Sequence, residues 1–256
     1  MSPSILRTAF VTGGARRIGR AIAESLAADG FAVAIHCHGS RAQADGVASE
    51  IRNRGGRAAV VVADLSVEAD VESLLLRASE AIGAIGLLVN NASVFERDDL
   101  ASATRTSWDR HMEPNLRAPF VLSQSFARQL PPDAEGLIVN LIDERVWNLT
   151  PHFVSYTISK AALWTLTKTL ALALAPRIRV CAIGPGPTLP SARQTAAQFA
   201  RQAASVPLQR PAELAEFAAA MRFLIAARSF TGQMLALDGG QHLNWGAVAP
   251  DTAPEE

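Results

Sequence analysis

The chain has 256 residues, with 24 basic and 24 acidic side chains, so its formal net charge is zero. That balance argues against a nucleic-acid or anionic membrane partner, because such partners attract strongly basic proteins. The length fits one sizeable domain, and the 49% of apolar residues can fill its core. We expect residues 1–246 to form this domain and the Ala/Pro/acid-rich residues 247–256 to form a flexible tail.

The same sequence predicts a cytoplasmic protein. Met1–Arg7 lacks the basic region and apolar stretch of a signal peptide, and no apolar run is long enough to span a bilayer. Cys37 and Cys181 lie inside apolar runs with strand character. We therefore expect buried free thiols, with a disulfide or redox pair as the alternative.

Apolar runs of strand length alternate along the chain with amphipathic segments of helix length. The segments, such as Gly19–Asp29 and Ala42–Arg54, repeat their apolar residues with a helical period. The runs are almost continuously apolar, as expected for strands covered on both faces. The expected strands are Thr8–Thr12, Ala32–Cys37, Ala58–Ala63, Leu87–Asn90, Leu137–Leu141, Arg179–Ile183 and Met234–Leu237.

This alternation predicts an α/β fold, a single-domain Rossmann-type doubly wound parallel sheet with helices on both faces. Ligands bind such a sheet in a crevice at the carboxyl ends of its strands. Pro185, Pro187 and Pro190 break the pattern. We expect an irregular substrate loop over the crevice at about residues 185–205.

The first strand runs into the glycine-rich segment Thr12–Gly19 and then into a helix. Glycines permit a tight turn and let backbone N–H groups approach a pyrophosphate, and the helix N-terminus adds a favourable dipole. A purely structural turn is the alternative. The candidate cofactor residues here are Gly13, Arg16, Arg17, Ile18 and Gly19.

The segment His36–Arg41, at the end of the second strand, contains no acidic residue. An NAD-selective site usually carries an acid there to bind the ribose 2′-hydroxyl. His38, Ser40, Arg17 and Arg41 could instead bind a 2′-phosphate, so NADP(H) is favoured. His36 and His38 have no third ligand nearby, so we expect no metal site.

The third expected strand is followed by Asp64 and Leu65. Asp64 could form a hydrogen bond to the adenine of the cofactor. A place in a helix N-cap region is the alternative for this carboxylate.

Tyr156 and Lys160 are four residues apart, and residues at that spacing share one face of a helix. The ammonium favours the phenolate and lowers the tyrosine pKa, which makes the phenol a usable general acid or base. Asp143 lies thirteen residues upstream of Tyr156. These three residues are the candidate catalytic set, although Asp143 could also be a solvated loop residue.

Together these residues resemble the short-chain dehydrogenase/reductase family over essentially the whole chain. The matching motifs are Thr12–Gly19, Asp64–Leu65, Asn90–Ala92, Asn115, Tyr156 with Lys160, Pro185–Gly186, Thr231–Gly232 and Asp238–Gly240. The resemblance implies that Asn115 completes the catalytic set, braces the helix beside the site and links Lys160 to water, with a buried structural amide as the alternative. It also implies contacts to the cofactor from Asn91, Ala92, Ser93, Tyr156, Lys160, Pro185 and Gly186.

Two departures from the family pattern resemble the pteridine reductase branch and its bacterial dihydromonapterin or dihydrofolate reductase-like relatives. Arg17 replaces the usual glycine, and Asp143 occupies the usual position of the catalytic serine. His36–Ser40 and Asn90–Phe95 also match that branch, although Gly39 stands where it has an arginine. The resemblance implies NADPH-dependent hydride transfer to a pteridine or related C=N heterocycle.

The same branch implies roles on the substrate side. Phe95 would stack on the pterin ring, Ser93 would bind the pterin or a cofactor phosphate, and Asp143 with Tyr156 would relay a proton to a ring nitrogen. A core phenylalanine and a loop cap are the alternatives for Phe95 and Ser93. Further candidates, with scaffold or subunit packing as the alternative, are Trp147, Trp164, Leu189 and Trp245.

The resemblance also implies a homotetramer, with helices at Ala103–Gln129 and Val154–Ala175 packed across one dyad. Two other functions stay open. The first is a carbonyl or 3-oxoacyl-carrier-protein reductase with an unusual acid. The second is a non-catalytic NADPH-binding regulator.

Overall fold

The computed structural model describes residues 5–191 and 193–243. Seven parallel strands form one sheet in the order β3-β2-β1-β4-β5-β6-β7. The strands are β1 Thr8–Val11, β2 Ala32–Cys37, β3 Ala58–Val62, β4 Leu87–Asn90, β5 Gly136–Leu141, β6 Ile178–Pro185 and β7 Met234–Leu237. The predicted α/β fold with a doubly wound parallel sheet is confirmed.

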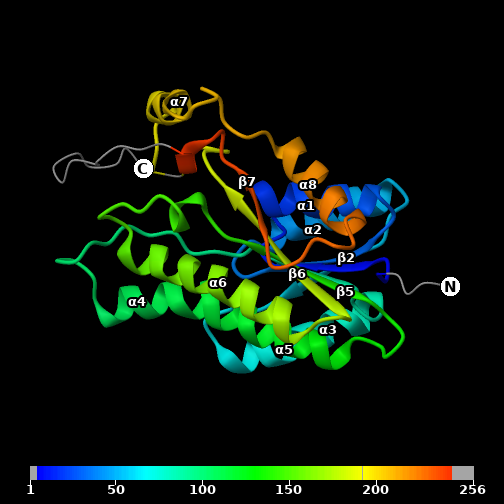
Figure 1. Cartoon of the computed structure of the whole chain (residues 1–256). Helices are drawn as coiled ribbons and strands as arrows, with labels where there is room; N and C mark the ends of the chain where they lie inside the picture. The colour runs from blue at the N-terminus through cyan, green and yellow to red at the C-terminus, as the bar shows by residue number, and fades with distance from the viewer. Residues whose placement is uncertain (1–4, 192, 244–256) are drawn as a thin grey trace.

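Helices cover both faces of this sheet (Figure 1). The α-helices are α1 Arg17–Ala28, α2 Arg41–Asn53, α3 Glu68–Ile82, α4 Arg105–Met112, α5 Ala118–Gln129, α6 Val154–Ala173, α7 Ala196–Ser205 and α8 Leu214–Ala226. In Figure 1, α1, α2 and α8 lie above the sheet, and α3, α5 and α6 lie below it.

Alternating side chains of the central strands enter two separate cores, one on each face of the sheet. In β1, Ala9 and Val11 pack into the core under α1, α2 and α8, whereas Phe10 packs into the core over α3, α5 and α6. All three side chains are fully buried. This double coverage is the physical reason why the strand sequences are continuously apolar instead of alternating.

The segment expected as one helix, Ala103–Gln129, contains an interruption. A π-helical turn, Glu113–Arg117, separates α4 from α5. Proline lacks a backbone N–H and its ring clashes with the carbonyl four residues earlier, so Pro114 is not compatible with a regular α-helix here. The wider turn keeps the chain helical across Pro114 and carries Asn115.

The expected irregular loop at 185–205 also needs correction at both ends. Strand β6 continues to Pro185, and residues 196–205 form helix α7. Thr195 caps α7, because Gln198 N–H donates to the Thr195 hydroxyl and Thr195 N–H donates to the Gln198 side chain. This Thr-x-x-Gln pattern is a capping-box signal that the sequence already contains.

Two expectations concern residues that the structure does not describe. The expected tail, 247–256, lies outside the described residues, as does Trp245. Among the described residues, no helix is both long enough and apolar enough to cross a bilayer.

Candidate active site

Two connected cavities lie at the carboxyl ends of the strands. The larger has a volume of about 620 Å³ and the smaller about 270 Å³. Both are lined by Arg17, Ile18, Asn91 and Ser93, so they are neighbouring parts of one crevice. The crevice opens beside β1, where the chain changes from building one side of the sheet to building the other, which is the usual ligand position in such sheets.

The glycine-rich loop after β1 forms one wall of the larger cavity. Gly13 has a φ of +62°, and a Cβ atom on Gly19 would lie 2.3 Å from the Gly13 carbonyl oxygen and 2.4 Å from Asn91 Nδ2. Larger residues cannot replace either glycine without moving the loop. Helix α1 begins directly behind this loop, and the side chain of its N-cap residue Arg16 makes no capping hydrogen bond.

This arrangement fits the pyrophosphate of a dinucleotide. Backbone N–H groups at an uncapped helix N-terminus bind anions, and a tight glycine loop lets the anion approach them. Asn91 holds the loop from the end of β4, because its Nδ2 donates to the Thr12 carbonyl at 2.8 Å and to the Gly13 carbonyl at 3.2 Å.

His36 is part of the loop scaffold. Gly13 N–H donates to His36 Nδ1 at 3.2 Å, so Nε2 carries the hydrogen and donates to the Ala63 carbonyl at 3.2 Å. Burial lowers the pKa of the His36 imidazole to about 4. The neutral ring therefore joins the glycine loop to the end of β3. The described residues contain no group of three or more His, Cys, Asp or Glu side chains that could hold a metal ion.

The far end of the larger cavity is lined by His38, Ser40, Asp64 and Leu65, together with Arg16. Asp64 accepts hydrogen bonds from the Ser66 hydroxyl and N–H, and these bonds lower the pKa of its carboxyl group. The carboxylate therefore closes a turn after β3 while it faces the cavity.

The guanidinium groups of the two arginines expected at a 2′-phosphate are both engaged in other contacts. The Arg41 guanidinium is paired with Asp45 at 2.8 Å and does not line the cavity. Arg17 donates to the carbonyls of Leu189 and Pro190 at 3.0 Å and 2.7 Å. Arg17 therefore connects the glycine loop to the substrate loop, and phosphate contacts from either arginine stay a prediction.

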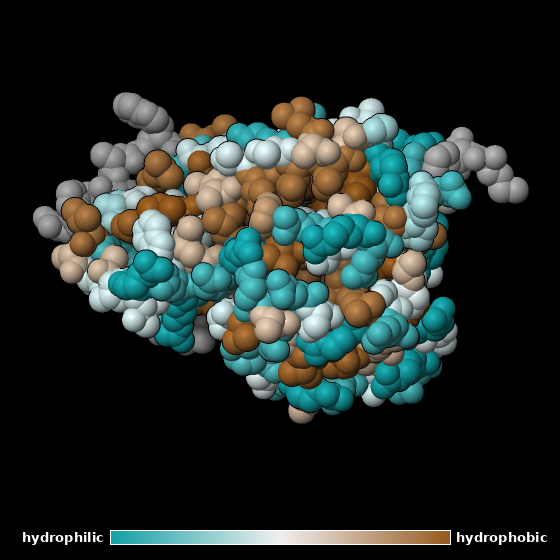
Figure 2. Space-filling model, turned by 90° about the horizontal axis from the view of Figure 1, so that it is seen from below, coloured by the Kyte–Doolittle hydropathy of each residue, from teal (hydrophilic) through white to brown (hydrophobic). Residues whose placement is uncertain are grey.

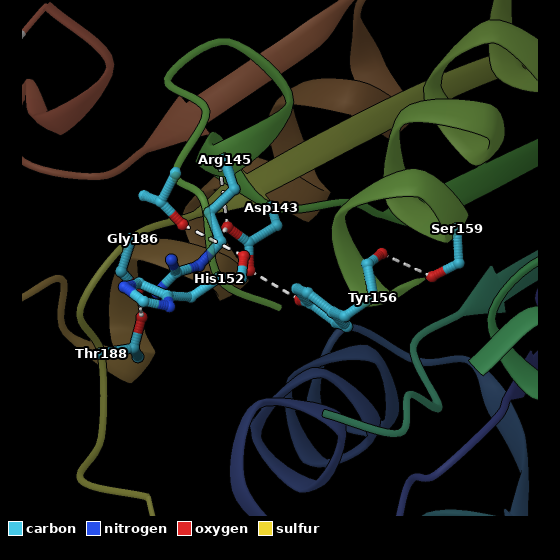
Figure 3. Close-up of polar contacts among 8 residues, drawn as sticks. Asp143, Arg145, His152, Tyr156, Ser159, Gly186 and Thr188 are labelled. Carbon is cyan, nitrogen blue, oxygen red and sulfur yellow. Dashed lines mark hydrogen bonds and ion pairs between the residues drawn. The ribbon is translucent and has the colours of Figure 1, made fainter. Parts of the chain in front are cut away.

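The three candidate catalytic residues meet in the smaller cavity. The Tyr156 hydroxyl donates to Asp143 Oδ2 at 2.6 Å, as Figure 3 shows. The other Asp143 oxygen accepts from Arg145 N–H at 2.9 Å, which fixes the orientation of the carboxylate. The Lys160 ammonium lies 5.9 Å from the centre of the Tyr156 ring. A tyrosine, a carboxylate and a cation at these distances can hold and move a proton.

Lys160 is anchored and almost completely buried. Its Nζ donates to the Leu141 carbonyl at 2.8 Å, and its exposed fraction is 2%. Burial lowers the pKa of the Lys160 ammonium to about 8, although the nearby Asp143 carboxylate acts in the opposite direction. The charge on this lysine is therefore sensitive to pH in the range where enzymes work.

Asn115 braces the loop that follows β4. Val94 N–H donates to Asn115 Oδ1 at 2.8 Å, and Asn115 Nδ2 donates to the Val94 carbonyl at 2.9 Å and to the Ser159 hydroxyl at 3.1 Å. The Ser159 hydroxyl in turn donates to the Tyr156 carbonyl (Figure 3). The π turn thus connects the loop carrying Ser93 and Phe95 to helix α6.

Phe95 lines the smaller cavity beside the reacting groups. Its ring is stacked on Phe153, with 4.6 Å between centres, and its edge-to-face partner is Tyr156 at the same separation. Stacking of a pterin on Phe95 stays a prediction.

Sequence reasoning did not identify Arg145, which lines the smaller cavity, or Arg193, which contacts Phe95. The guanidinium carbons of Arg145 and Arg193 lie 5.7 Å and 5.5 Å from the Phe95 ring centre. Arg193 also donates to the Phe95 carbonyl at 2.9 Å and pairs with Glu96 at 3.1 Å. Only the tertiary structure brings Arg193 to Phe95, because 98 residues separate them along the chain.

The remaining candidates divide between the cavity and the scaffold. Pro185, Gly186 and Leu189 line the smaller cavity, and Ala92 lines the larger one. Trp147 and Trp164 contact each other edge to face, with ring centres 6.2 Å apart, and line neither cavity. In Figure 3, Gly186 and Thr188 lie on the opposite side of Asp143 from Tyr156 in this view.

Comparison with known proteins gives relatives along most of the chain. Residues 7–201 match the family model described as short chain dehydrogenase. A curated relative, the 3-oxoacyl-[acyl-carrier-protein] reductase FabG of Staphylococcus epidermidis, is 30% identical over 242 residues, covering 93% of this chain and 99% of that protein.

Two solved structures are more similar still. FolM alternative dihydrofolate reductase 1 of Brucella canis, complexed with NADP, is 52% identical, with a TM-score of 0.93 over 99% of this chain and 100% of that chain. The FolM protein of Brucella suis, also in complex with NADP, is 54% identical, with a TM-score of 0.91 over 96% and 98% of the two chains.

Proposed function

This chain belongs to the short-chain dehydrogenase family, and from that premise we propose that it is an NADPH-dependent reductase of a pteridine or related C=N heterocycle. The observation that carries the proposal is the Asp143 carboxylate hydrogen-bonded to the Tyr156 hydroxyl at 2.6 Å. A serine hydroxyl at this position would help to polarise a ketone oxygen. A carboxylate can pass a proton towards a ring nitrogen.

The cofactor is NADP(H), in agreement with the relatives at 52% and 54% identity. The glycine loop, the N-terminus of α1 and Asn91 would hold its pyrophosphate, and His38 and Ser40 would lie at its 2′-phosphate. When bound, NADPH supplies the hydride for the reduction.

The residues of the chain bind, orient and protonate the substrate. Phe95 and the substrate loop would enclose a planar heterocycle in the smaller cavity, and an aromatic face suits such a ring. Tyr156 would donate the proton that the reduced ring nitrogen needs, and the phenolate would regain a proton from solvent through the Asp143 carboxylate. The Lys160 charge would stabilise Tyr156 after the transfer.

A substrate panel tests this proposal directly. NADPH oxidation is followed with dihydropterins and dihydrofolate, and with 3-oxoacyl thioesters and simple ketones as contrast. We expect turnover of the dihydropterins and at most weak turnover of the ketones. In Tyr156→Phe, NADPH binding should persist while kcat falls by about 10²–10⁴-fold.

The two alternatives have their own signatures in the same panel. Faster reduction of 3-oxoacyl thioesters would identify a carbonyl reductase, a possibility that the FabG relative at 30% identity keeps open. Tight NADPH binding without turnover of any compound would identify a regulator.

We also propose that residues 1–246 form one reductase domain. The protein would be a homotetramer in the cytoplasm. Figure 2 shows hydrophobic residues gathered across the face seen from below, which carries the lower helices of Figure 1. On α6, Ile158 and Leu172 are 39% and 84% exposed, as expected for side chains that pack against another subunit. Cys37 and Cys181 are free and buried, which suits a reducing compartment. A monomer in light scattering would contradict the tetramer.

A further inference from the structure

Three polar side chains that have no role in the proposed reaction are buried together next to Tyr156. They are Asp98 from the loop after β4, His111 from α4 and Ser155 from α6, with exposed fractions of 3%, 0% and 0%. The Ser155 hydroxyl donates to Asp98 Oδ2 and lies 2.7 Å from His111 Nδ1. None of the three lines either cavity, so we expect no direct contact between this polar cluster and a ligand bound there.

The hydrogen bonds of the cluster have a defined direction. Glu96 N–H donates to His111 Nε2 at 3.0 Å, so the ring hydrogen is on Nδ1. Nδ1 lies 2.9 Å from the Ser107 carbonyl and close to Ser155, which can share this hydrogen. The Ser155 hydroxyl hydrogen is then free to go to Asp98. Burial lowers the pKa of the His111 imidazole, which favours this neutral form.

The hydrogen bonds of the cluster hold the backbone of the loop that carries Phe95. Glu96, the next residue, is held by His111, and Asp98 is held by the Ser155 hydroxyl and by Ser155 N–H at 3.2 Å. The Asp98 carbonyl also accepts from Phe153 N–H at 2.7 Å. Asn115 holds Val94 on the other side of Phe95. The Phe95 ring therefore projects from a backbone that is fixed before and after it.

The same cluster holds the start of helix α6, where Tyr156 directly follows Ser155. The His111 ring lies 6.1 Å from the Tyr156 ring, and the Tyr156 ring lies 4.6 Å from Phe95. Phe153, the ring on which Phe95 stacks, has a left-handed backbone with a φ of +58°. Such a conformation persists only when neighbouring contacts enforce it, and the bond to Asp98 is one of them.

We propose that Asp98, His111 and Ser155 are positioning residues that set the separation between the Phe95 ring and the Tyr156 hydroxyl. This rests on the proposed function for the identity of the substrate, a planar heterocycle that must lie against Phe95 while it receives a proton from Tyr156. Removing the Ser155 hydroxyl leaves the Asp98 carboxylate short of a donor in a buried place, which forces the loop to move.

The test compares two buried serines. Ser155→Ala removes the centre of the cluster, whereas Ser123→Ala removes a buried hydroxyl on α5 that bonds only to the Pro119 carbonyl among the contacts described, at 2.6 Å. For Ser155→Ala we expect kcat/KM for a dihydropterin to fall by about ten- to hundred-fold, through KM as Phe95 moves and through kcat as Tyr156 moves, with the NADPH Kd within two-fold of wild type. Ser123→Ala should keep kcat/KM within two-fold.

A spectroscopic measurement tests the cluster without a substrate. Tyr156 is the only tyrosine in the chain, so ring-labelled tyrosine yields the NMR signals of this residue alone. With NADP bound, we expect these signals to shift in Ser155→Ala and to stay unchanged in Ser123→Ala. As a conservative change, His111→Gln retains a side-chain acceptor for Glu96 N–H and should preserve more of kcat/KM than His111→Ala.

Three results would overturn the proposal: an unchanged kcat/KM in Ser155→Ala, an equal loss in Ser123→Ala, or tyrosine signals that do not respond to Ser155→Ala. Failure of the proposed function has a different signature. In that case the wild-type protein reduces no dihydropterin, while the tyrosine signals still report whether the cluster positions Tyr156.

Discussion

Asp143 shows how one residue decides the chemistry that the site can offer. Its two carboxylate oxygens have separate partners, the Tyr156 hydroxyl at 2.6 Å and the Arg145 N–H at 2.9 Å. Because the second bond caps a short 3₁₀ helix at Glu144–Val146, the carboxylate is oriented by the backbone as well as by Tyr156. A group held in this way is pre-organised for proton transfer.

The substitution Asp143→Ser tests this chemistry. Serine can also cap the 3₁₀ helix, so the variant should fold and bind NADPH normally. Turnover of the best dihydropterin should fall by about 10²–10⁴-fold, because the proton relay to the ring nitrogen is lost. Weak ketone reduction could be gained. If steady-state assays show full dihydropterin activity in this variant, Asp143 is outside the proton path.

We expect deprotonation of Lys160 to lower the rate of reduction at alkaline pH. Its ammonium has a pKa lowered to about 8, so the charge is present below that pH and is lost as pH rises through it. The rate of reduction should therefore fall above pH 8. Arginine keeps its charge at all these pH values. In Lys160→Arg the decline in rate should therefore begin at a higher pH, even if the absolute rate is low. Identical alkaline limbs in the two proteins would show that Lys160 does not control the decline.

Among the secondary-structure elements, we expect the β2–α2 connection to determine cofactor choice. Ser40 is the N-cap residue of α2, yet its side chain makes no capping hydrogen bond. It lines the larger cavity together with His38. The hydroxyl and the positive end of the α2 dipole can both face a 2′-phosphate.

Ser40→Asp should weaken NADPH binding more than NADH binding without harming the fold, since aspartate is an equally good N-cap residue. The new carboxylate repels a 2′-phosphate and can accept a hydrogen bond from a 2′-hydroxyl. Losing a charged phosphate contact costs about 1.5–3 kcal/mol, or roughly ten- to hundred-fold in affinity. Titration with NADPH and NADH measures both constants. Equal affinities of the wild-type protein for the two cofactors would contradict the predicted preference for NADPH.

For the whole molecule, His36 connects stability to pH. In the folded protein the ring stays neutral down to a pKa of about 4, whereas an unfolded histidine takes up a proton near 6.5. The unfolded state therefore binds more protons between these values. Stability is complete above pH 6.5 and is lost as pH falls towards 4.

Urea unfolding at pH 7 and pH 4.5 measures this loss. His36 should account for a decrease in the free energy of unfolding on the order of 2–3 kcal/mol between the two pH values. His36→Asn keeps an acceptor near Gly13 N–H but cannot titrate. The variant should be less stable at pH 7 and should lose less stability on acidification. An equal decrease in both proteins would mean that other groups, such as His111, cause it.

The strand pattern, the glycine loop and the Tyr156–Lys160 pair could be predicted from the sequence because each depends on residues close together along the chain. Apolar runs identify strands buried on both faces, and a four-residue spacing on a helix identifies a shared face. The seven predicted strands correspond to the seven of the sheet, β6 differing most by its continuation to Pro185. The absence of an acid after β2 is likewise evident from the sequence alone.

Only the tertiary structure decided which distant groups meet. Arg17 contacts the substrate loop 172 and 173 residues away, and Ser155 bonds to Asp98 across 57 residues. The π turn at Glu113–Arg117 also depends on packing, because it lets the chain pass Pro114 while Asn115 reaches Val94. A sequence states which side chains can form such bonds. The sheet order and the helix packing bring their partners within reach, and burial then fixes the protonation of groups such as Lys160 and His36.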